Sequence, residues 1–377
     1  MAATSSPCDP GAGQRARCEE LRALAARELR PLAERGGPGR VNRPLVAALG
    51  EHGLLARLFP DDGPVRAVEL CLLRECLASV CTEAETALAL QGLGAHPVAD
   101  RGTPAQRERW IPEVVAGRAV AAFALSEPGA GSDAAALELA AEPDGAGWRL
   151  TGEKCWISNA PEADLYTVFA RTGEGERSRG VTAFLVPGDR RGLTGEPVEM
   201  LSPHPIGTLA FDAVAVGPDD VLGRPGGGFA VAMRTLDLFR PSVGAFAVGM
   251  ARAALEAAVA HAGERRAFGG PLKDLQAVSH QLAEMATRTE AARLLVHSAA
   301  AAHDAGEPGV AARAAMAKLF ATETAQYVVD AAVQLHGARA LRRGHLLEHL
   351  YREVRAPRIY EGASEVQRTI IAKELYR

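Results

Sequence analysis

Hydrophobic and polar positions divide the chain into three stretches with different periodicities. From about residue 15 to 120, apolar residues recur at helical spacing, and the segment around 67–94 is apolar on most faces, which predicts a helix buried among others. From about 121 to 225, short alternating runs are separated by Gly, Pro and Asp, as in antiparallel strands joined by turns. From about 226 onward, long Ala-rich helical patterns return.

The longest of these late patterns, over residues 274–304, carries an apolar seam with steps of three and four. The seam consists of Leu275, Val278, Leu282, Met285, Thr289, Ala292 and Leu295. Such a seam predicts a helix packed in a bundle. We therefore predict an α+β multidomain chain with a helical domain over 1–120, an antiparallel β-domain over 121–225 and a helix bundle over 226–377.

Composition narrows the function classes. The 377 residues are 47% hydrophobic and 23% charged, an ordinary soluble balance, and the net charge of -4 gives no overall basic field for nucleic acid or anionic membranes. No run of about 18 apolar residues predicts a membrane span, and the N-terminus lacks a secretory pattern, so we expect a cytoplasmic protein. Six cysteines without Cys-x-x-Cys spacing predict reduced thiols and no metal site.

A Gly-rich stretch, "FALSEPGAGSD" at 123–133, is the first candidate binding element. Gly129 and Gly131 would let backbone N–H groups approach a ligand, and Ser126 and Ser132 add hydroxyls. Such a loop suits a pyrophosphate or a heteroaromatic edge, although an ordinary turn is the simpler explanation of the stretch alone. It lacks the G-x-G-x-x-G spacing of a dinucleotide fingerprint.

A second candidate element is "KCWISNAPEADLYTVFA". In a strand, Trp156 and Ser158 point to the same face, so an indole and a hydroxyl could together cover a flat cofactor. A half-buried core tryptophan explains the same pattern.

A third element, "IYEGASEV" at 359–366, places Glu361 between Tyr360 and Gly362 just before the last predicted helix. An acidic residue at a helix N-terminus is favoured by the helix dipole. Alternatively, burial against Tyr360 would raise the pKa of the Glu361 carboxyl from about 4.3 toward that of a useful general base.

Two further stretches follow the same order along the chain, "AGERRAFGGPLKDLQAVSHQLAEM" and "AVQLHGARAL". Taken together and in order, these elements resemble the acyl-CoA dehydrogenase family from about residue 90 to the C-terminus. The resemblance implies a helical N-terminal domain, a barrel-like middle β-domain and a C-terminal four-helix bundle. It also implies non-covalent FAD, a homodimer or homotetramer, and an electron-transfer flavoprotein or another acceptor.

The resemblance also implies roles for individual residues. The residues that would line the flavin and its pyrophosphate are Leu125, Ser126, Gly131, Ser132, Trp156 and Ser158. Those that would reach the FAD of a neighbouring subunit are Arg265, Phe268 and Gln276. Those that would meet the adenosine half of FAD are Gln334 and Gly337. Ala363 and Glu365 fall at further cofactor positions, where relatives often carry a threonine and an uncharged amide. Ser132, Asp237, Arg240, Tyr360 and Gly362 are implied on the substrate side. We expect Asp237 and Arg240 at the start of a bundle helix, where a simple ion pair is the alternative.

The resemblance implies that Glu361 is the base that removes the α-proton of an acyl thioester while the β-hydrogen leaves as hydride to the flavin. Altered motifs, such as "QLHGARALRRG", resemble the acyl-ACP dehydrogenase branch that prepares hydroxymalonyl- or methoxymalonyl-type extender units for polyketides. Short-chain acyl-CoA catabolism, a flavin oxidase or monooxygenase, and a DNA-associated relative are the alternatives. The net charge offers the DNA-associated reading no support.

Overall fold

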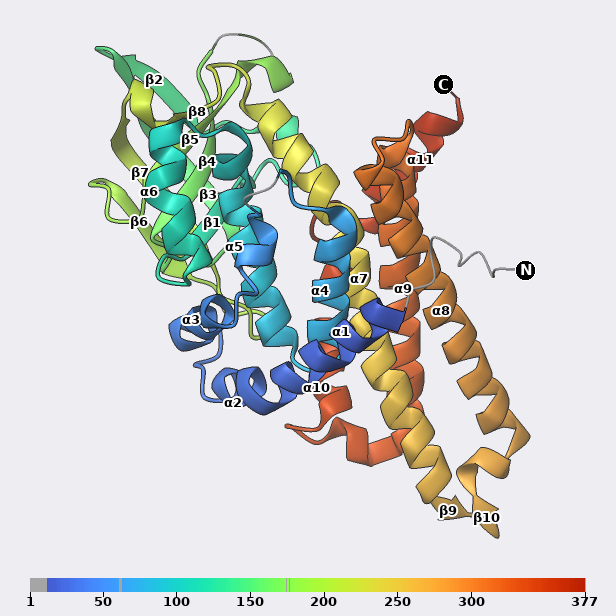
Figure 1. Cartoon of the computed structure of the whole chain (residues 1–377). Helices are drawn as coiled ribbons and strands as arrows, with labels where there is room; N and C mark the ends of the chain where they lie inside the picture. The colour runs from blue at the N-terminus through green and yellow to red at the C-terminus, as the bar shows by residue number, and fades with distance from the viewer. Residues whose placement is uncertain (1–11, 61–62, 174, 176, 377) are drawn as a thin grey trace. The chain divides into compact units, whose positions relative to one another are not determined.

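The computed structural model of the protein describes residues 12–60, 63–173, 175 and 177–376. The chain forms two compact units, whose elements are labelled in Figure 1. A helical unit draws on Met1–Arg30, Arg66–Glu85 and Leu238–Arg377, and a β-containing unit on Pro31–Val65 and Thr86–Asp237. Each unit is therefore assembled from segments that are far apart in sequence.

The β-containing unit is built on an eight-stranded sheet with the order β6-β7-β3-β2-β4-β5-β8 and β1 paired to β4. The strands are β1 (Ala121–Ala124), β2 (Ala140–Asp144), β3 (Gly147–Ser158), β4 (Leu165–Arg171), β5 (Val181–Pro187), β6 (Leu193–Pro197), β7 (Ile206–Val216) and β8 (Val221–Leu222). Helices α2 (Arg30–Ala33), α3 (Arg43–Glu51), α5 (Thr82–Arg101) and α6 (Pro104–Val115) accompany them.

Strand direction departs in part from the antiparallel prediction. The pairs β2–β3, β3–β7, β4–β5, β5–β8 and β6–β7 are antiparallel, whereas β1 runs parallel to β4 and β2 meets β4 in parallel. Alternation of apolar residues marks a strand but carries no information about the direction of its partner.

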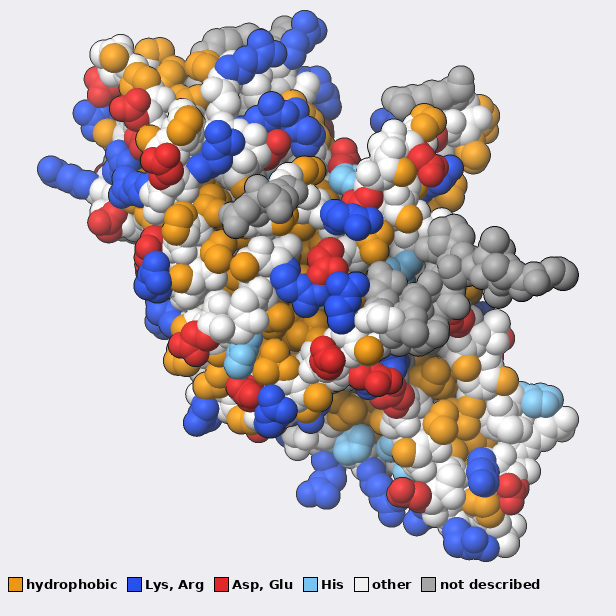
Figure 2. All heavy atoms as spheres, viewed as in Figure 1, with side chains coloured by type: hydrophobic (Ala, Val, Ile, Leu, Met, Phe, Trp, Pro, Cys, Tyr) orange, Lys and Arg blue, Asp and Glu red, His pale blue; other side chains and the backbone are white. Residues whose placement is uncertain are grey.

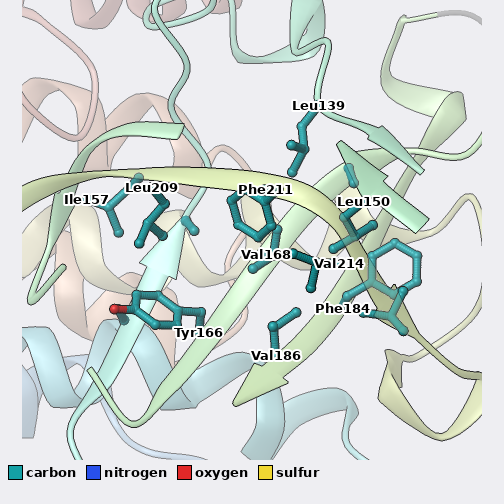
Figure 3. Close-up of a cluster of buried hydrophobic side chains, with 14 of the residues drawn as sticks. Leu139, Leu150, Ile157, Tyr166, Val168, Phe184, Val186, Leu209, Phe211 and Val214 are labelled. Atoms are coloured by element: carbon teal, nitrogen blue, oxygen red, sulfur yellow. The ribbon is translucent and has the colours of Figure 1, made fainter. Parts of the chain in front are cut away.

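Inward-facing side chains from these strands form the core of the β-domain. Figure 3 shows Leu150, Val168 and Phe211 gathered with neighbours from several strands. Trp148 meets Phe184 edge to face, with ring centroids 5.5 Å apart. This packed sheet gives the loops at its edge a rigid support.

The helical unit contains α1 (Ala12–Leu24), α4 (Ala67–Ala78), α7 (Gly228–Glu264), α8 (Gln276–Asp304), α9 (Val310–His336), α10 (Leu346–Glu353) and α11 (Ser364–Leu375). A short hairpin of β9 (Arg266–Ala267) and β10 (Gly270–Pro271) joins α7 to α8. Helices α5 and α7 contribute residues to both units.

Small residues allow the helices of this unit to approach closely, as the Ala-rich pattern predicts. A Cβ added to Gly249 of α7 would collide with Glu75 and Ala78 of α4. One added to Gly244 would press on Val296 of α8. The predicted seam of α8 is buried at Met285, Thr289 and Ala292 but continues through Val296 instead of Leu295, and its first three members are half-buried.

By length and composition, helix α7 is long and apolar enough to cross a membrane. Polar residues interrupt its apolar positions, so it contains no unbroken apolar run of about 18 residues. Because 67% of its most apolar window is buried inside the protein, α7 has the character of a bundle-core helix. On the face drawn in Figure 2, acidic and basic side chains are interspersed, in keeping with the small net charge.

The cysteines are free thiols at Cys18, Cys71, Cys76, Cys81 and Cys155, whereas Cys8 lies outside the described residues. Among the residues that the structure describes, no group of three or more His, Cys, Asp or Glu side chains could hold a metal ion.

Candidate active site

The turn before α11 has a strained backbone. Glu361 has φ 50° and Gly362 has φ 92°, so two consecutive residues adopt left-handed conformations. A non-glycine residue in this region is strained and persists only where its surroundings hold it. A Cβ on Gly362 would also collide with the side-chain amide of Gln367, so both space and φ require glycine here.

Three side chains fix this turn from outside it. Lys318 of α9 donates from Nζ to the Gly362 carbonyl at 2.8 Å, and Gln367 of α11 donates from Nε2 to the same oxygen at 2.8 Å. Glu323 accepts from Ser364 Oγ at 2.6 Å and pairs with Arg358 Nη2 at 2.8 Å. Helix α9 therefore supports the turn on both sides of Glu361.

The Glu361 carboxylate lies in a buried and charged environment. Burial raises the pKa of this carboxyl, and the positive charges of Arg74, Lys318 and Arg240 oppose that rise. Its Oε2 atom is buried and has no hydrogen-bond partner among the described residues. A buried carboxylate oxygen left without a donor is costly, which points to a reacting partner at this position.

A buried ion pair lies in the surroundings of this turn. Arg74 of α4 pairs through Nε with Glu85 and donates from Nη1 to Ser242 Oγ at 2.7 Å. Burial raises the pKa of the Tyr360 hydroxyl well above 10, and this tyrosine interacts electrostatically with Arg74, Glu85 and Glu361. The environment of the candidate base is thus buried but highly charged.

Asp237 and Arg240 do not lie at a helix start, and that prediction is wrong. Helix α7 begins at Gly228 and continues through Pro241, so both residues occupy its interior. Pro241 lies inside this long helix, which continues past it to Glu264. Arg240 is buried and contributes to the electrostatics of Glu361, while Asp237 is half-buried.

In the β-containing unit, the Gly-rich stretch and strand β3 are tied together. Lys154 donates from Nζ to the Leu125 carbonyl at 2.9 Å and pairs with Glu127 Oε1 at 2.7 Å. The Cys155 N–H donates to the Ser126 carbonyl at 3.0 Å. These contacts bring the two candidate flavin elements side by side.

Trp156 occupies an irregular point of β3. The register between β3 and β7 shifts between Lys154 and Ile157, and Trp156 has φ 57° within that shift. Its side chain is 58% exposed, which excludes the core-tryptophan alternative, while Ile157 is buried and Ser158 is half-buried. The bulge thus presents the indole on the open side of the strand.

The two glycines of the Gly-rich loop face open space. Gly129 and Gly131 do not have positive φ, and a Cβ on either would meet nothing within 4 Å. Neither backbone conformation nor packing within the described chain therefore requires glycine there. The open space beside these glycines and the exposed Ser132 leaves room for a ligand, as expected of a loop that approaches a cofactor.

The remaining candidates lie at the far ends of α7 and α9. His261 of α7 stacks on His336 of α9 with centroids 4.2 Å apart, which brings the segment of Arg265 toward that of Gln334 and Gly337. Gly337 also ends α9 with φ 61°. Phe268, at the tip of the β9–β10 hairpin, has φ 52° and is 91% exposed, and Gln276 begins α8.

Two candidates beside the Glu361 turn show ordinary structural roles. Ala363 is the N-cap residue of α11 and provides no side-chain hydrogen bond, as expected from the missing hydroxyl. Glu365 is exposed and pairs with Arg368 at 3.4 Å.

Sequence reasoning missed the residues that hold the site. These are Arg74, Glu85, Glu127, Lys154, Lys318, Glu323 and Gln367. A usable signal was present, because charged residues interrupt otherwise apolar helical runs such as "CLLRECLASVCTEAE" and "AAMAKLFA".

Comparisons with known proteins identify the family of the chain. The chain matches family models described as acyl-CoA dehydrogenase N-terminal domain over residues 12–118, middle domain over 122–214 and C-terminal domain over 226–376. It is 37% identical to a probable acyl-CoA dehydrogenase of Mycobacterium tuberculosis, over 95% of this chain and 94% of that protein. It is also 37% identical to the mitochondrial short-chain specific acyl-CoA dehydrogenase of Bos taurus, over 95% and 89%.

Among solved structures, the chain resembles butyryl-CoA dehydrogenase from Megasphaera elsdenii with a TM-score of 0.90 and 33% identity, covering 97% of this chain and 98% of that one. The three-domain fold of helical N-terminal, β middle and helical C-terminal domains is shared with it. The protein belongs to the acyl-CoA dehydrogenase family. It is accordingly an FAD-dependent oxidoreductase.

Proposed function

We propose that this protein dehydrogenates a short acyl thioester between its α and β carbons, with Glu361 as the base that takes the α-proton. The observation that carries the proposal is the buried Oε2 of Glu361, which has no hydrogen-bond partner in the described part of the chain, on a strained turn. Burial raises the pKa of this carboxyl, which strengthens it as a base for a weakly acidic carbon. The N–H of Glu361 is a candidate donor to the enolate oxygen that develops on the thioester.

The flavin is the second partner of the reaction. Leu125, Ser126, Gly131, Ser132, Trp156 and Ser158 would hold its ring side, with Ala363 and Glu365 as further candidates. Arg265, Phe268 and Gln276 would reach the FAD of a second copy, and Gln334 and Gly337 its adenosine half. When bound, FAD supplies an acceptor for the two electrons and the hydrogen that leave the β-carbon. The assembly proposed is a homodimer or homotetramer.

The acyl group proposed is small and polar. Arg74 of the buried Arg74–Glu85 pair interacts electrostatically with Tyr360 and the base, and a long alkyl chain gains little beside buried charges. Asp237, Arg240, Tyr360, Gly362 and Ser132 are the substrate-side candidates. A short chain with a hydroxyl or carboxyl group, as in a polyketide extender unit, matches this environment.

For the carrier we propose an acyl-carrier protein, with coenzyme A as the second candidate. The altered motifs near Arg339, Arg342 and Arg343 favour the first, because an acidic carrier surface is attracted to exposed arginines. The similarity to a short-chain specific acyl-CoA dehydrogenase favours the second. An electron-transfer flavoprotein is the proposed acceptor, and the cytoplasm the proposed location.

The test is anaerobic bleaching of flavin absorbance in the purified holoprotein. Butyryl and 2-hydroxyacyl groups are offered on coenzyme A and on an acyl-carrier protein to the wild type, Glu361→Gln and Glu290→Gln. The last variant removes a carboxylate from the exposed face of α8 and serves as the control. Loss of the base should slow bleaching by roughly 10²–10⁴. The carrier that bleaches the wild type faster is the natural one.

Other outcomes replace the proposal. Equal bleaching by Glu361→Gln removes the base assignment. Substrate-dependent oxygen consumption in air at the turnover rate would establish an oxidase or monooxygenase instead. Retardation of DNA at moderate salt without any thioester oxidation would establish the DNA-associated alternative.

A further inference from the structure

The placement of lysine in this chain is unusual. Of 42 cationic side chains, four are lysines: Lys154, Lys273, Lys318 and Lys373. Lys273 and Lys373 are exposed, whereas Lys154 and Lys318 are fully buried, each with 0% exposure. Burying an ammonium group is costly, so a chain that otherwise uses arginine keeps lysine at two interior positions that each need a specific partner.

The contact of Lys318 explains its position. Its ammonium donates to the carbonyl of Gly362, the residue directly after the candidate base, at 2.8 Å. Gln367 donates to the same carbonyl and more weakly, at 3.3 Å, to the carbonyl of Glu361 itself. Gln367 can therefore help to hold the left-handed turn, but it brings no charge to the base.

The charges around Lys318 make it an electrostatic partner of the base. Glu361, Glu323 and Glu365 stabilise its charged form, whereas Arg240 opposes it. Burial dominates and lowers the pKa of Lys318 from 10.5 to about 8. In return, the Lys318 ammonium, together with Arg74 and Arg240, opposes protonation of the Glu361 carboxyl, while Glu85 partners Arg74.

We propose that Lys318 is the positioning residue for Glu361: its ammonium holds the Gly362 carbonyl, and so the strained turn, while its charge keeps the buried carboxylate ionised. The inference rests on the proposed function in assigning the base to Glu361. It deepens that assignment by making Lys318, beside Arg74 and Arg240, one of the buried cations that set the lower pH limit of the base. Deprotonation of the same lysine sets an upper limit.

Three substitutions separate the two parts of this role. Lys318→Met removes both the charge and the donor, Lys318→Gln keeps a donor without charge, and Lys318→Arg keeps both. Lys373→Met removes an exposed lysine of α11 and is the matched control. Each holoprotein is titrated while the protonated-carboxyl stretch of Glu361 is followed by infrared spectroscopy, identified by its absence in Glu361→Gln. The acid limb of the bleaching rate with butyryl-CoA is measured in parallel.

Loss of the cation should move the ionisation of Glu361, and the acid limb with it, to higher pH by about one unit in the Met and Gln variants. Lys318→Arg should restore the wild-type position, and Lys373→Met should retain it. A purely structural lysine would lower the rate without moving either titration, and that result overturns the proposal, as does an equal shift in Lys373→Met. If Lys318→Met does not fold, the comparison of Lys318→Gln with Lys318→Arg still tests whether the charge at this position moves the ionisation of Glu361.

The infrared titration also separates this inference from the proposed function. If Glu361→Gln bleaches normally, Glu361 is not the base, yet the infrared signal still reports whether Lys318 controls its ionisation.

Discussion

The two buried lysines hold two loops in similar ways but with different consequences. In the β-containing unit, Lys154 ties the Gly-rich stretch to β3 through the Leu125 carbonyl and Glu127. In the helical unit, Lys318 holds the turn of Glu361 through the Gly362 carbonyl. Burial is the main cause that lowers the pKa of each lysine from 10.5 to about 8.

What differs is where the compensating negative charge lies. Glu127 contacts Lys154 directly, and its carboxylate also accepts the N–H groups of Glu138 at 2.5 Å and Leu139 at 2.9 Å. That network is satisfied within itself and serves the architecture. For Lys318 a main compensating charge is the carboxylate of Glu361, the group proposed to react. The same residue type thus supports a scaffold in one unit and adjusts a base in the other.

Breaking the first network should have the largest effect on stability. Lys154→Met leaves Glu127 buried and without its cation, and removing one partner of a buried pair typically costs about 3–5 kcal/mol. Denaturant unfolding of the apoprotein measures the loss. The double variant Lys154→Met/Glu127→Gln should recover part of it, because it removes the uncompensated charge. Equal losses in the single and double variants would show that the pair is not coupled.

The pH dependence of stability gives the next largest effect. The folded pKa of Lys318, about 8, lies below its ordinary 10.5, so between these values the unfolded chain binds more protons. The cost of burying the charge is therefore complete below about pH 8 and disappears as the pH rises toward 10.5. As the pH rises across this window, the unfolding free energy of the wild type should increase by about 3 kcal/mol relative to that of Lys318→Met. A constant difference from pH 7 to 10.5 would contradict the lowered pKa.

These contrasts also explain what the sequence could predict. Glu361 and Trp156 lie in local motifs, so a short stretch carries their signal. Lys318 lies 43 positions before Glu361 and becomes relevant only when α9 packs against the final turn. The parallel pairing of the four-residue β1 leaves no mark in the alternation that identifies strands. The predicted start of α7 is misplaced because the stretch around Asp237 and Arg240 does not show that the helix already begins at Gly228.

Gly362→Ala tests how strongly the turn of the proposed base depends on its conformation. Alanine at φ 92° is strained, and its Cβ would displace the Gln367 amide from the Gly362 carbonyl, so we expect a loss of about 2 kcal/mol together with slower bleaching. Gly306→Ala is the control, because Gly306 has φ 65° but open space around its Cβ. It should cost about 1 kcal/mol and leave the bleaching rate unchanged. Equal stability losses in both variants would show that the Gln367 contact contributes nothing.

The smallest stability effect is expected at Gly131 in the Gly-rich loop, because this glycine, unlike Gly362 in the Glu361 turn, is required neither by its φ nor by its neighbours. Gly131 has no positive φ and no neighbour within 4 Å of an added Cβ, so Gly131→Ala should leave the apoprotein unchanged or more stable by about 0.5 kcal/mol. If the open space beside this loop accommodates the flavin, the same methyl group should weaken FAD retention, measured by equilibrium dialysis of the reconstituted protein. Gly217→Ala, another site with open space, should change neither quantity. Normal FAD affinity in Gly131→Ala would remove the loop from the cofactor site, because glycine would then have no role there that alanine cannot fill.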